Sequence, residues 1–159
     1  MAYKIKFGTD GWRAIIADTY TVENVRRVAH ATALWCNQNK ENSSIVIGYD
    51  CRFGGEMFMK TSAEVFAFHG IKVLLSKEFV STPMVSLATQ KTGSFAGIVI
   101  TASHNPPSYN GFKIKAHYGG PASPIEIDKV EKLIPDSLDY ETLSFDAYLE
   151  KGEIGRAHV

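Results

Sequence analysis

Short apolar runs alternate with helical repeats along most of the chain, and this alternation constrains the fold more than any other feature. The apolar runs have the length of buried strands and span residues 44–48, 71–75 and 95–101. Elsewhere, apolar residues recur at steps of three and four, which is typical of helices that bury one face. These helical segments span residues 21–39, 55–69 and 82–91. The alternating order with short connections predicts a parallel sheet between helices.

Residues with known preferences for helix ends mark the boundaries of these segments. Thr21 is a candidate N-cap, and Gly70 suits the position just past the end of a helix. Thr82 is a second candidate N-cap, followed by proline at the first helical position. The run Ser123-Pro-Ile-Glu is a capping box, which predicts a further helix of about 11 residues that stops before Pro135.

The run 111–116 differs from the other strands because its polar and apolar residues alternate. Alternation indicates a half-exposed strand, so we expect it to pair antiparallel at one edge of the sheet. The predicted fold class is therefore α/β: a three-layer α/β/α domain with a mostly parallel sheet and one antiparallel edge strand. We expect residues 1–150 to form this domain. A short helix at 146–152 should lead out of it, and residues 151–159 should begin a linker to a second domain.

Composition excludes several classes of protein. The 17 basic and 17 acidic residues cancel, so the chain has no basic field to hold nucleic acid or an anionic membrane. The N-terminus has no signal-peptide pattern, and the longest apolar runs are too short to cross a bilayer. Cys36 and Cys51 have no second pair or nearby histidine at zinc-ligand spacing, which favours free thiols. We expect a soluble cytoplasmic protein.

Three polar loops follow the predicted parallel strands at their carboxyl ends, where open α/β sheets bind ligands. They begin at Asp50, Ser81 and Thr101. The third loop, residues 101–110, is longer than a plain connection between two strands needs. Its two prolines remove backbone donors and stiffen the chain, which makes sense if a side chain must be held still.

Ser103 is the candidate reactive residue of this third loop. His104 is next to it, and Lys113 follows in the emerging strand. A hydroxyl near an imidazole and an ammonium suits phosphoryl transfer, because positive charge and hydrogen-bond donors around the phosphate supply most of the catalysis. The residues alone also allow a module that binds phosphosugars without catalysis.

Other nucleophile and nucleotide motifs are missing from the sequence. The frame around Ser103 is Thr-Ala-Ser-His-Asn rather than Gly-x-Ser-x-Gly, which disfavours an α/β-hydrolase. The chain contains no Gly-x-x-x-x-Gly-Lys-Ser/Thr and no Gly-x-Gly-x-x-Gly after a strand. P-loop and dinucleotide-binding proteins are therefore disfavoured as well.

Three motifs resemble those of the α-D-phosphohexomutases. They are Phe7-Gly-Thr-Asp-Gly-Trp-Arg, Gly48-Tyr-Asp-Cys-Arg, and Gly97-Ile-Val-Ile-Thr-Ala-Ser-His-Asn-Pro-Pro-Ser-Tyr-Asn-Gly-Phe-Lys-Ile. They occur in the family's order between residues 7 and 114. The Pro-Pro-x-Tyr-Asn-Gly-Phe-Lys segment is similar to the phosphoglucomutase/phosphomannomutase branch.

The resemblance implies roles for individual residues. Ser103 matches the serine that carries a phosphoryl group, exchanges it with hexose 1- and 6-phosphates through a bisphosphorylated sugar, and completes Mg²⁺ coordination through a phosphate oxygen. Arg13 and Lys113 match basic residues that bind substrate and assist transfer, and His104 matches a residue of the same catalytic loop. Hexose 1,6-bisphosphate is then expected as activator and intermediate.

The resemblance covers only the first of the family's four domains. The aspartate-rich metal loop, the sugar-recognition loop and the last phosphate-binding loop have no match in this chain. We therefore expect the remaining mutase domains as partners, most Mg²⁺ ligands from the second domain, and little activity from the chain alone. Arg52 either supports the serine loop or lies on the surface. His69 and His117 are interpreted as ordinary residues.

Overall fold

A computed structural model of the protein describes residues 3–9, 11–39 and 43–157. Within these residues, six strands form one sheet in the order β1-β5-β4-β2-β3-β6. The strands are β1 (Trp12–Ile15), β2 (Ser44–Tyr49), β3 (Lys72–Leu75), β4 (Ala96–Ile100), β5 (Tyr109–Ala116) and β6 (Ile154–Arg156). The helices are α1 (Val22–Asn39), α2 (Gly55–Phe68), α3 (Thr82–Lys91), α4 (Pro124–Lys132) and α5 (Phe145–Glu150).

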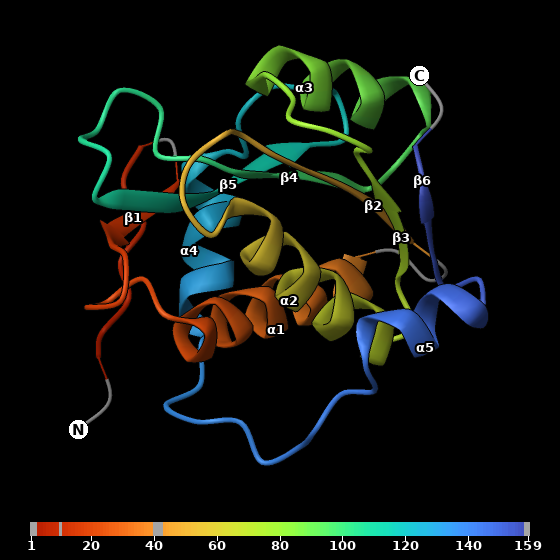
Figure 1. The fold of residues 1–159 in the computed structure, drawn as a ribbon, viewed down its shortest axis with the longest axis horizontal. Coiled ribbons are helices and arrows are strands. Elements are labelled where there is room, and N and C mark those ends of the chain that lie inside the picture. Colours follow the sequence, from red (N-terminus) through yellow and green to blue (C-terminus); the bar gives the residue numbers. More distant parts are fainter. Residues whose placement is uncertain (1–2, 10, 40–42, 158–159) are drawn as a thin grey trace.

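The helices cover the sheet unequally. Helices α1, α2 and α4 pack together on one face, with α5 beside α2 and β6, whereas α3 covers the other face alone (Figure 1). Strands β4, β2, β3 and β6 are mutually parallel. Strand β5 is antiparallel to both of its neighbours, β4 and β1. The expected three-layer α/β/α fold with a mostly parallel sheet is confirmed.

The position and burial of β5 differ from the sequence prediction. Strand β1 forms the edge, and β5 lies one place inside it, so the antiparallel edge is a pair of strands. Strand β5 is not half-exposed either, since Lys113 and Lys115 are 3% and 7% exposed. These lysines lie opposite Val99 and Gly97 of β4, on the face that α3 covers. The alternation of polar and apolar residues in β5 therefore distinguishes two buried faces of the sheet, not one buried face and one solvent-exposed face.

The segment expected to begin a linker contributes to the sheet. Its residues 154–156 form β6 and pair in parallel with Val73–Leu75 of β3. The short helix that precedes it, α5, forms as predicted. The sheet therefore continues past residue 150, and the prediction that a linker to a further domain starts in this region stays a prediction.

Most helix ends follow the sequence signals. The Thr21 hydroxyl accepts a hydrogen bond from the backbone N–H of Asn24 at 3.2 Å, and both hydrogen bonds of the Ser123 capping box form. Helix α4 ends at Lys132, somewhat earlier than expected. The N-cap of α3 is Ser81 rather than Thr82.

The main hydrophobic core lies between the sheet and the α1–α2–α4 layer. Trp12 stacks on Tyr20 with ring centroids 4.7 Å apart, and Tyr20 meets Phe58 edge to face at the same distance. A smaller cluster built on Val85 and Val99 joins α3 to the other face. None of the helices in the described ranges is long and apolar enough to cross a membrane.

Candidate active site around Ser103

The Ser103 loop starts where β4 ends, beside the loop that follows β2. Strands β2 and β4 are parallel neighbours, with Tyr49 opposite Ile100. Their following loops, residues 50–54 and 101–108, therefore meet at one edge of the sheet. Ser103 is exposed on this edge.

Ser103 has a backbone conformation that is uncommon for a serine. Its φ of +56° lies in the left-handed region, where a side chain with a Cβ is disfavoured. A residue stays in this region only when surrounding contacts hold it there. The contacts that do so come from both loops.

A chain of polar contacts fixes the start of the loop. The Thr101 hydroxyl accepts a hydrogen bond from the Ser103 N–H at 3.0 Å and donates to the Asp50 carboxylate. The other oxygen of Asp50 accepts from the backbone N–H of Arg52 at 3.0 Å. The backbone of Ser103 is thereby linked to the end of β2.

Arg52 holds the rest of the loop. Its Nη2 donates to the carbonyl oxygens of Ser103 and Asn105 at 2.8 and 2.7 Å, and its Nη1 donates to those of Pro106 and Tyr109 at 2.8 and 3.0 Å. Its Nε lies 3.5 Å from Asp50 Oδ2. A guanidinium can serve several acceptors at once because its donors are fixed in one plane. Arg52 supports the serine loop, which answers the question that the sequence left open.

Arg13 approaches the loop from β1. It pairs with Gly111 of β5, and its Nη1 donates to Asn105 Oδ1 at 2.9 Å. A Cβ at Gly111 would lie 2.6 Å from the Thr101 carbonyl oxygen and 2.8 Å from that of Trp12. Only glycine therefore allows β1, β5 and the loop to approach this closely.

Lys113 and His104 are the remaining residues expected here. Lys113 lies on β5 two residues beyond Gly111, so it shares the face of the sheet on which Arg13 lies. A Cβ at Gly11 would lie 2.9 Å from its Cγ, so this glycine leaves room for the lysine stem. His104 is exposed next to Ser103. The two strands thus bring cationic side chains to the face that carries the serine loop.

The site is rich in cations and poor in metal ligands. In the described ranges, no three His, Cys, Asp or Glu side chains group closely enough to hold a metal ion. Asp50, whose carboxylate reaches the loop, is engaged with Thr101 and Arg52. The arrangement can therefore surround an anionic group on Ser103 with hydrogen-bond donors. Its described residues provide few ligands for a metal cation.

Comparison with known proteins identifies the family. A sequence model described as "Phosphoglucomutase/phosphomannomutase, alpha/beta/alpha domain I" matches residues 4–141. The chain belongs to this family. It corresponds to the first domain, as the three sequence motifs predicted.

Individual relatives agree with this assignment. The chain is 36% identical over 156 residues to a phosphoglucomutase of Staphylococcus saprophyticus, covering 94% of this chain and 28% of that protein. A crystal structure of a Thermus thermophilus protein assigned as a phosphomannomutase matches 94% of this chain and 36% of its own, with 36% identity and a TM-score of 0.84. A phosphoglucomutase/phosphomannomutase family protein from Burkholderia thailandensis matches with 27% identity and a TM-score of 0.72, covering 91% and 32%. The chain spans about a third or less of the length of these proteins.

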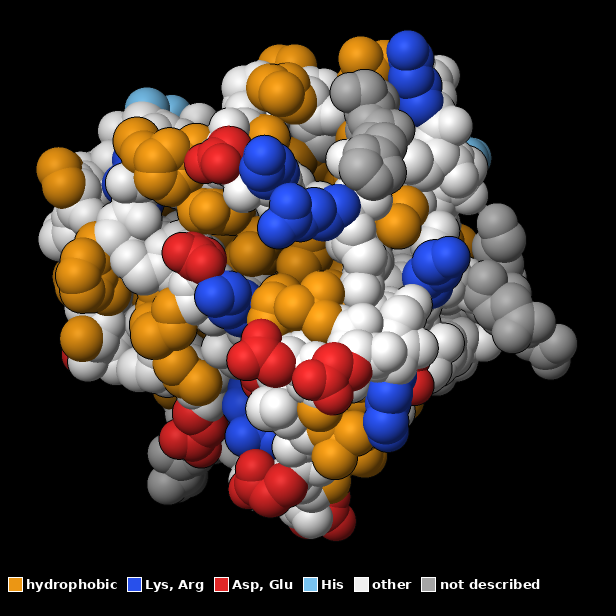
Figure 2. Space-filling model, turned by 45° about the vertical axis from the view of Figure 1, so that its right-hand side comes forward, with side chains coloured by type: hydrophobic (Ala, Val, Ile, Leu, Met, Phe, Trp, Pro, Cys, Tyr) orange, Lys and Arg blue, Asp and Glu red, His pale blue; other side chains and the backbone are white. Residues whose placement is uncertain are grey.

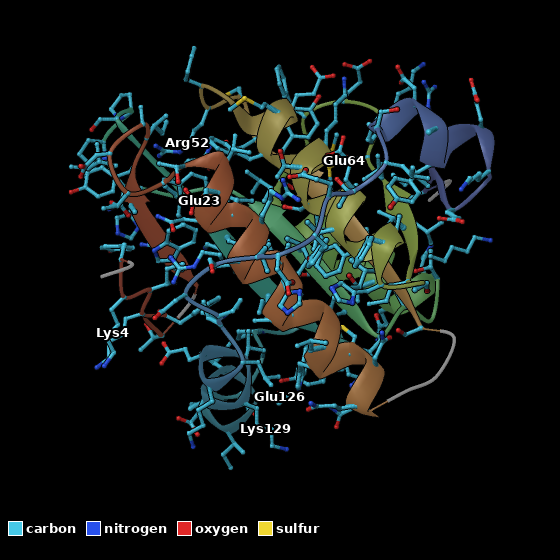
Figure 3. All side chains as sticks on the ribbon, turned by 90° about the horizontal axis from the view of Figure 1, so that it is seen from below. Lys4, Glu23, Arg52, Glu64, Glu126 and Lys129 are labelled. Carbon is cyan, nitrogen blue, oxygen red and sulfur yellow. The ribbon has the colours of Figure 1, made fainter. Side chains whose placement is uncertain are left out.

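Some residues of the candidate site were not singled out by sequence reasoning. Asp50 and Asn105 were read only as parts of polar loops, although they connect Arg52 and Arg13 to the serine segment. The sequence signal that could have identified them is their position in the loops that follow β2 and β4, which are neighbouring parallel strands. Figure 3 labels Arg52 at the end of the molecule where α1 and α2 begin, near Glu23.

An apolar groove lies elsewhere on the α3 side. It is lined by Phe79, Val80, Met84, Leu87 and residues around them, and by none from the Ser103 loop. Figure 2 shows hydrophobic side chains gathered near the middle of one face of the molecule, bordered by both basic and acidic side chains. The groove is separate from the serine site.

Proposed function

We propose that this chain is the phosphoryl-carrying first domain of a hexose phosphate mutase, with Ser103 as the carrier. The observation that supports this most directly is the exposed serine whose backbone is held by Arg52 in a left-handed conformation. A carrier must present one oxygen to both substrate and product in the same position. A fixed loop on the edge of a rigid sheet meets this requirement.

The proposed reaction has two transfers of opposite direction. In the first, the bond between phosphorus and Ser103 Oγ breaks, the phosphoryl group bonds to the free hydroxyl of a hexose monophosphate, and the hydroxyl proton passes to the serine oxygen. The bisphosphorylated sugar then turns in the site. In the second transfer its other phosphoryl group returns to Ser103, which restores the starting enzyme and isomerises the sugar phosphate.

Charge balance assigns roles to the basic residues. A phosphoserine carries about −1.5 to −2 charges at neutral pH. Arg13 and Lys113 lie on the face of the sheet where the loop begins, and we assign them to binding the phosphate groups and stabilising charge during transfer. We assign His104, which is exposed beside the serine, to assisting proton movement.

The family implies Mg²⁺, and the donor set of the described residues fits a partial site only. A phosphate oxygen on Ser103 would be the ligand from this chain, since the described residues group no three metal-binding side chains. Bound Mg²⁺ supplies positive charge that stabilises the transferring phosphoryl group. We propose that the other ligands, and the residues that choose between glucose and mannose phosphates, belong to further domains.

The test uses the full-length enzyme that contains this chain. Intact-mass analysis should find one phosphate on Ser103, and addition of glucose 1-phosphate with Mg²⁺ should transfer it to the sugar. The S103A variant should lack this phosphate and lose turnover by several orders of magnitude, because the nucleophile itself is gone. Near-normal turnover in S103A would exclude the phosphoenzyme mechanism. Sugar phosphate binding without any transfer would instead indicate a non-catalytic module.

The 159-residue chain provides a second comparison. We expect it to show negligible conversion of glucose 1-phosphate to glucose 6-phosphate, because it has few Mg²⁺ ligands of its own among the described residues. Robust conversion by the purified chain would contradict this expectation.

A further inference from the structure

One half of the sheet is covered by helices on one face only. Among the described helices, α3 alone lies on its side of the sheet (Figure 1), and it packs mainly on β2, β4 and β5. Strands β3 and β6 therefore have no helical layer on that side within the described ranges. Parallel strands are normally buried on both faces. This half of the α3-side face lacks the layer that an α/β/α fold usually has.

The residues that face this side show how open it is. Leu74 of β3 pairs with Gly155 of β6, and their neighbours Val73 and Ile154 belong to the main core on the other face. Because successive side chains alternate, Leu74 and Gly155 face the α3 side. Leu74 packs against the small apolar cluster under α3 but is only half-buried. A Cβ at Gly155 would meet no atom of the described residues within 4 Å.

The apolar groove lies along this open half. It has a volume of about 340 Å³ and is lined mainly by α3, by the connection 76–80 between β3 and α3, and by Ala157 just past β6. Three large apolar side chains of its lining are exposed: Phe79 by 62%, Met84 by 55% and Leu87 by 49%. Exposed apolar side chains gathered in one groove are typical of an interaction surface.

The wall of the groove is held in place by β2. The Phe79 ring meets the Tyr49 ring edge to face, with centroids 5.4 Å apart. The Val80 N–H donates to the Tyr49 carbonyl oxygen at 2.9 Å, and the Ser76 N–H donates to that of Ile47 at 2.9 Å. The connection is therefore anchored at both ends. Its exposed apolar side chains are part of the ordered surface of the domain.

The chain itself leads to the groove. The Ala157 N–H donates to the Leu75 carbonyl oxygen at 2.9 Å, so the pairing with β3 continues past β6 to a residue that lines the groove. This chain covers only 28% of the Staphylococcus saprophyticus relative and 36% of the Thermus thermophilus one. In an enzyme of that length, residues that follow 159 would start close to the groove.

We propose that the segment directly after residue 159 of the full-length enzyme covers this groove and packs an apolar face on Phe79, Met84 and Leu87. Connectivity favours this occupant. A segment that starts near the groove needs only a short closing loop. A second copy or another protein must lose its translational and rotational freedom to bind there. The inference rests on the part of the proposed function that gives the chain further domains, and not on phosphoryl transfer.

The charges at the groove indicate the chemistry of the covering segment. Lys77, Lys91 and Glu78 line the groove and are exposed. Two cations against one anion favour acidic residues beside the apolar face of the segment. An amphipathic helix has this distribution of side chains, and it would complete the missing helical layer.

Maleimide labelling of L87C in the full-length enzyme and in the 159-residue chain tests the coverage. Because Leu87 is exposed, L87C should react readily in the 159-residue chain. In the full-length enzyme it should react at least tenfold more slowly. Ile125 is 72% exposed on α4, across the sheet, so I125C should react at similar rates in both chains. Peptide mass spectrometry separates these labels from that on the exposed Cys51.

Photo-crosslinking identifies the occupant and does not depend on L87C. A benzoylphenylalanine in place of Met84 in the full-length enzyme should crosslink to a residue beyond 159 of the same chain. The product should therefore keep the mass of one chain on a denaturing gel. A product of twice that mass would assign the groove to a second copy and overturn the proposal, as would the absence of any crosslink.

Equal labelling rates of L87C in the two chains would also overturn the proposal, as would an equal slowing of L87C and I125C in the full-length enzyme. The phosphate on Ser103 is measured separately on the same enzyme. A phosphorylated Ser103 together with fast labelling of L87C would reject the covering segment and leave the proposed function intact. A protected L87C without phosphate on Ser103 would do the reverse.

Discussion

The two faces of the sheet contain different kinds of side chains, although the same strands supply both. The face toward α1, α2 and α4 is filled with large apolar and aromatic residues. The face toward α3 carries a small apolar cluster and, next to it, the buried Lys113 and Lys115 of β5 and the half-buried Arg13 of β1. We infer that one face supplies most of the folding free energy and the other presents the chemistry.

Strand alternation explains how one short strand serves both faces. In β1, Trp12 points into the core and the adjacent Arg13 points to the serine loop. In β5, Phe112 belongs to the same core and Lys113 to the opposite face. Since successive side chains point to opposite faces, a core residue and a site residue can be neighbours in sequence. Substitutions at adjacent positions should therefore affect different properties.

The largest expected effect on stability is at Phe66, which is fully buried in the α1–α2 core. The F66A variant should lose about 3–5 kcal/mol of the free energy of unfolding, because it removes most of a buried ring and leaves a cavity. Urea denaturation of the 159-residue chain measures this loss. F53A alters a phenylalanine that is 78% exposed and should stay within about 0.5 kcal/mol of the unaltered chain. Equal effects of the two variants would contradict the assignment of the folding free energy to the buried α1–α2 core.

A smaller effect is expected at Ser103 itself, because its φ of +56° suits glycine. S103G should be more stable than S103A by roughly 1 kcal/mol, since glycine adopts the left-handed region without the clash of a Cβ. Neither variant retains the hydroxyl, so the comparison isolates the backbone. Denaturation midpoints of the two variants measure the difference. An S103A chain as stable as S103G would show that the loop does not hold this residue under strain.

The layered fold was predictable because its signals are local. Three apolar runs and the helices between them gave the central strands β2, β3 and β4 within a residue or two. The capping box at Ser123 placed the start of α4 correctly. These features depend on periodicity and helix-end chemistry, which neighbouring residues determine.

The edges of the sheet were not predictable in the same way. Strands β1 and β6 are four and three residues long, too short for a periodic pattern, and they form only because a partner strand is available. The burial of Lys113 and Lys115 was missed for a related reason. Their alternation with Phe112 and Ile114 is the pattern of a solvent-facing strand, and only the position of α3 shows otherwise.

The sequence proposes the members of the candidate site but not the contacts that support them. Ser103, His104 and Lys113 are candidates from the loop residues, Arg13 is added by the resemblance of the three motifs, and the catalytic roles of all four stay predictions. The role of Arg52 could not be predicted in this way, because its hydrogen-bond acceptors are backbone carbonyl groups, which no particular residue type indicates. Any residue has a backbone carbonyl, so four of them can be bound by one guanidinium without any particular side chains.

Turnover of the R52A variant in the full-length enzyme tests the central claim most directly: that Arg52 holds the loop that presents Ser103. Loss of its four carbonyl contacts should lower kcat by about 100-fold, because small displacements of a reacting group are costly. R52K keeps the charge but cannot reach four acceptors, and should fall nearly as far. The Tm should change far less than in F66A. A near-normal kcat in R52A would contradict the account. So would a fall in kcat that is fully explained by a smaller fraction of folded protein.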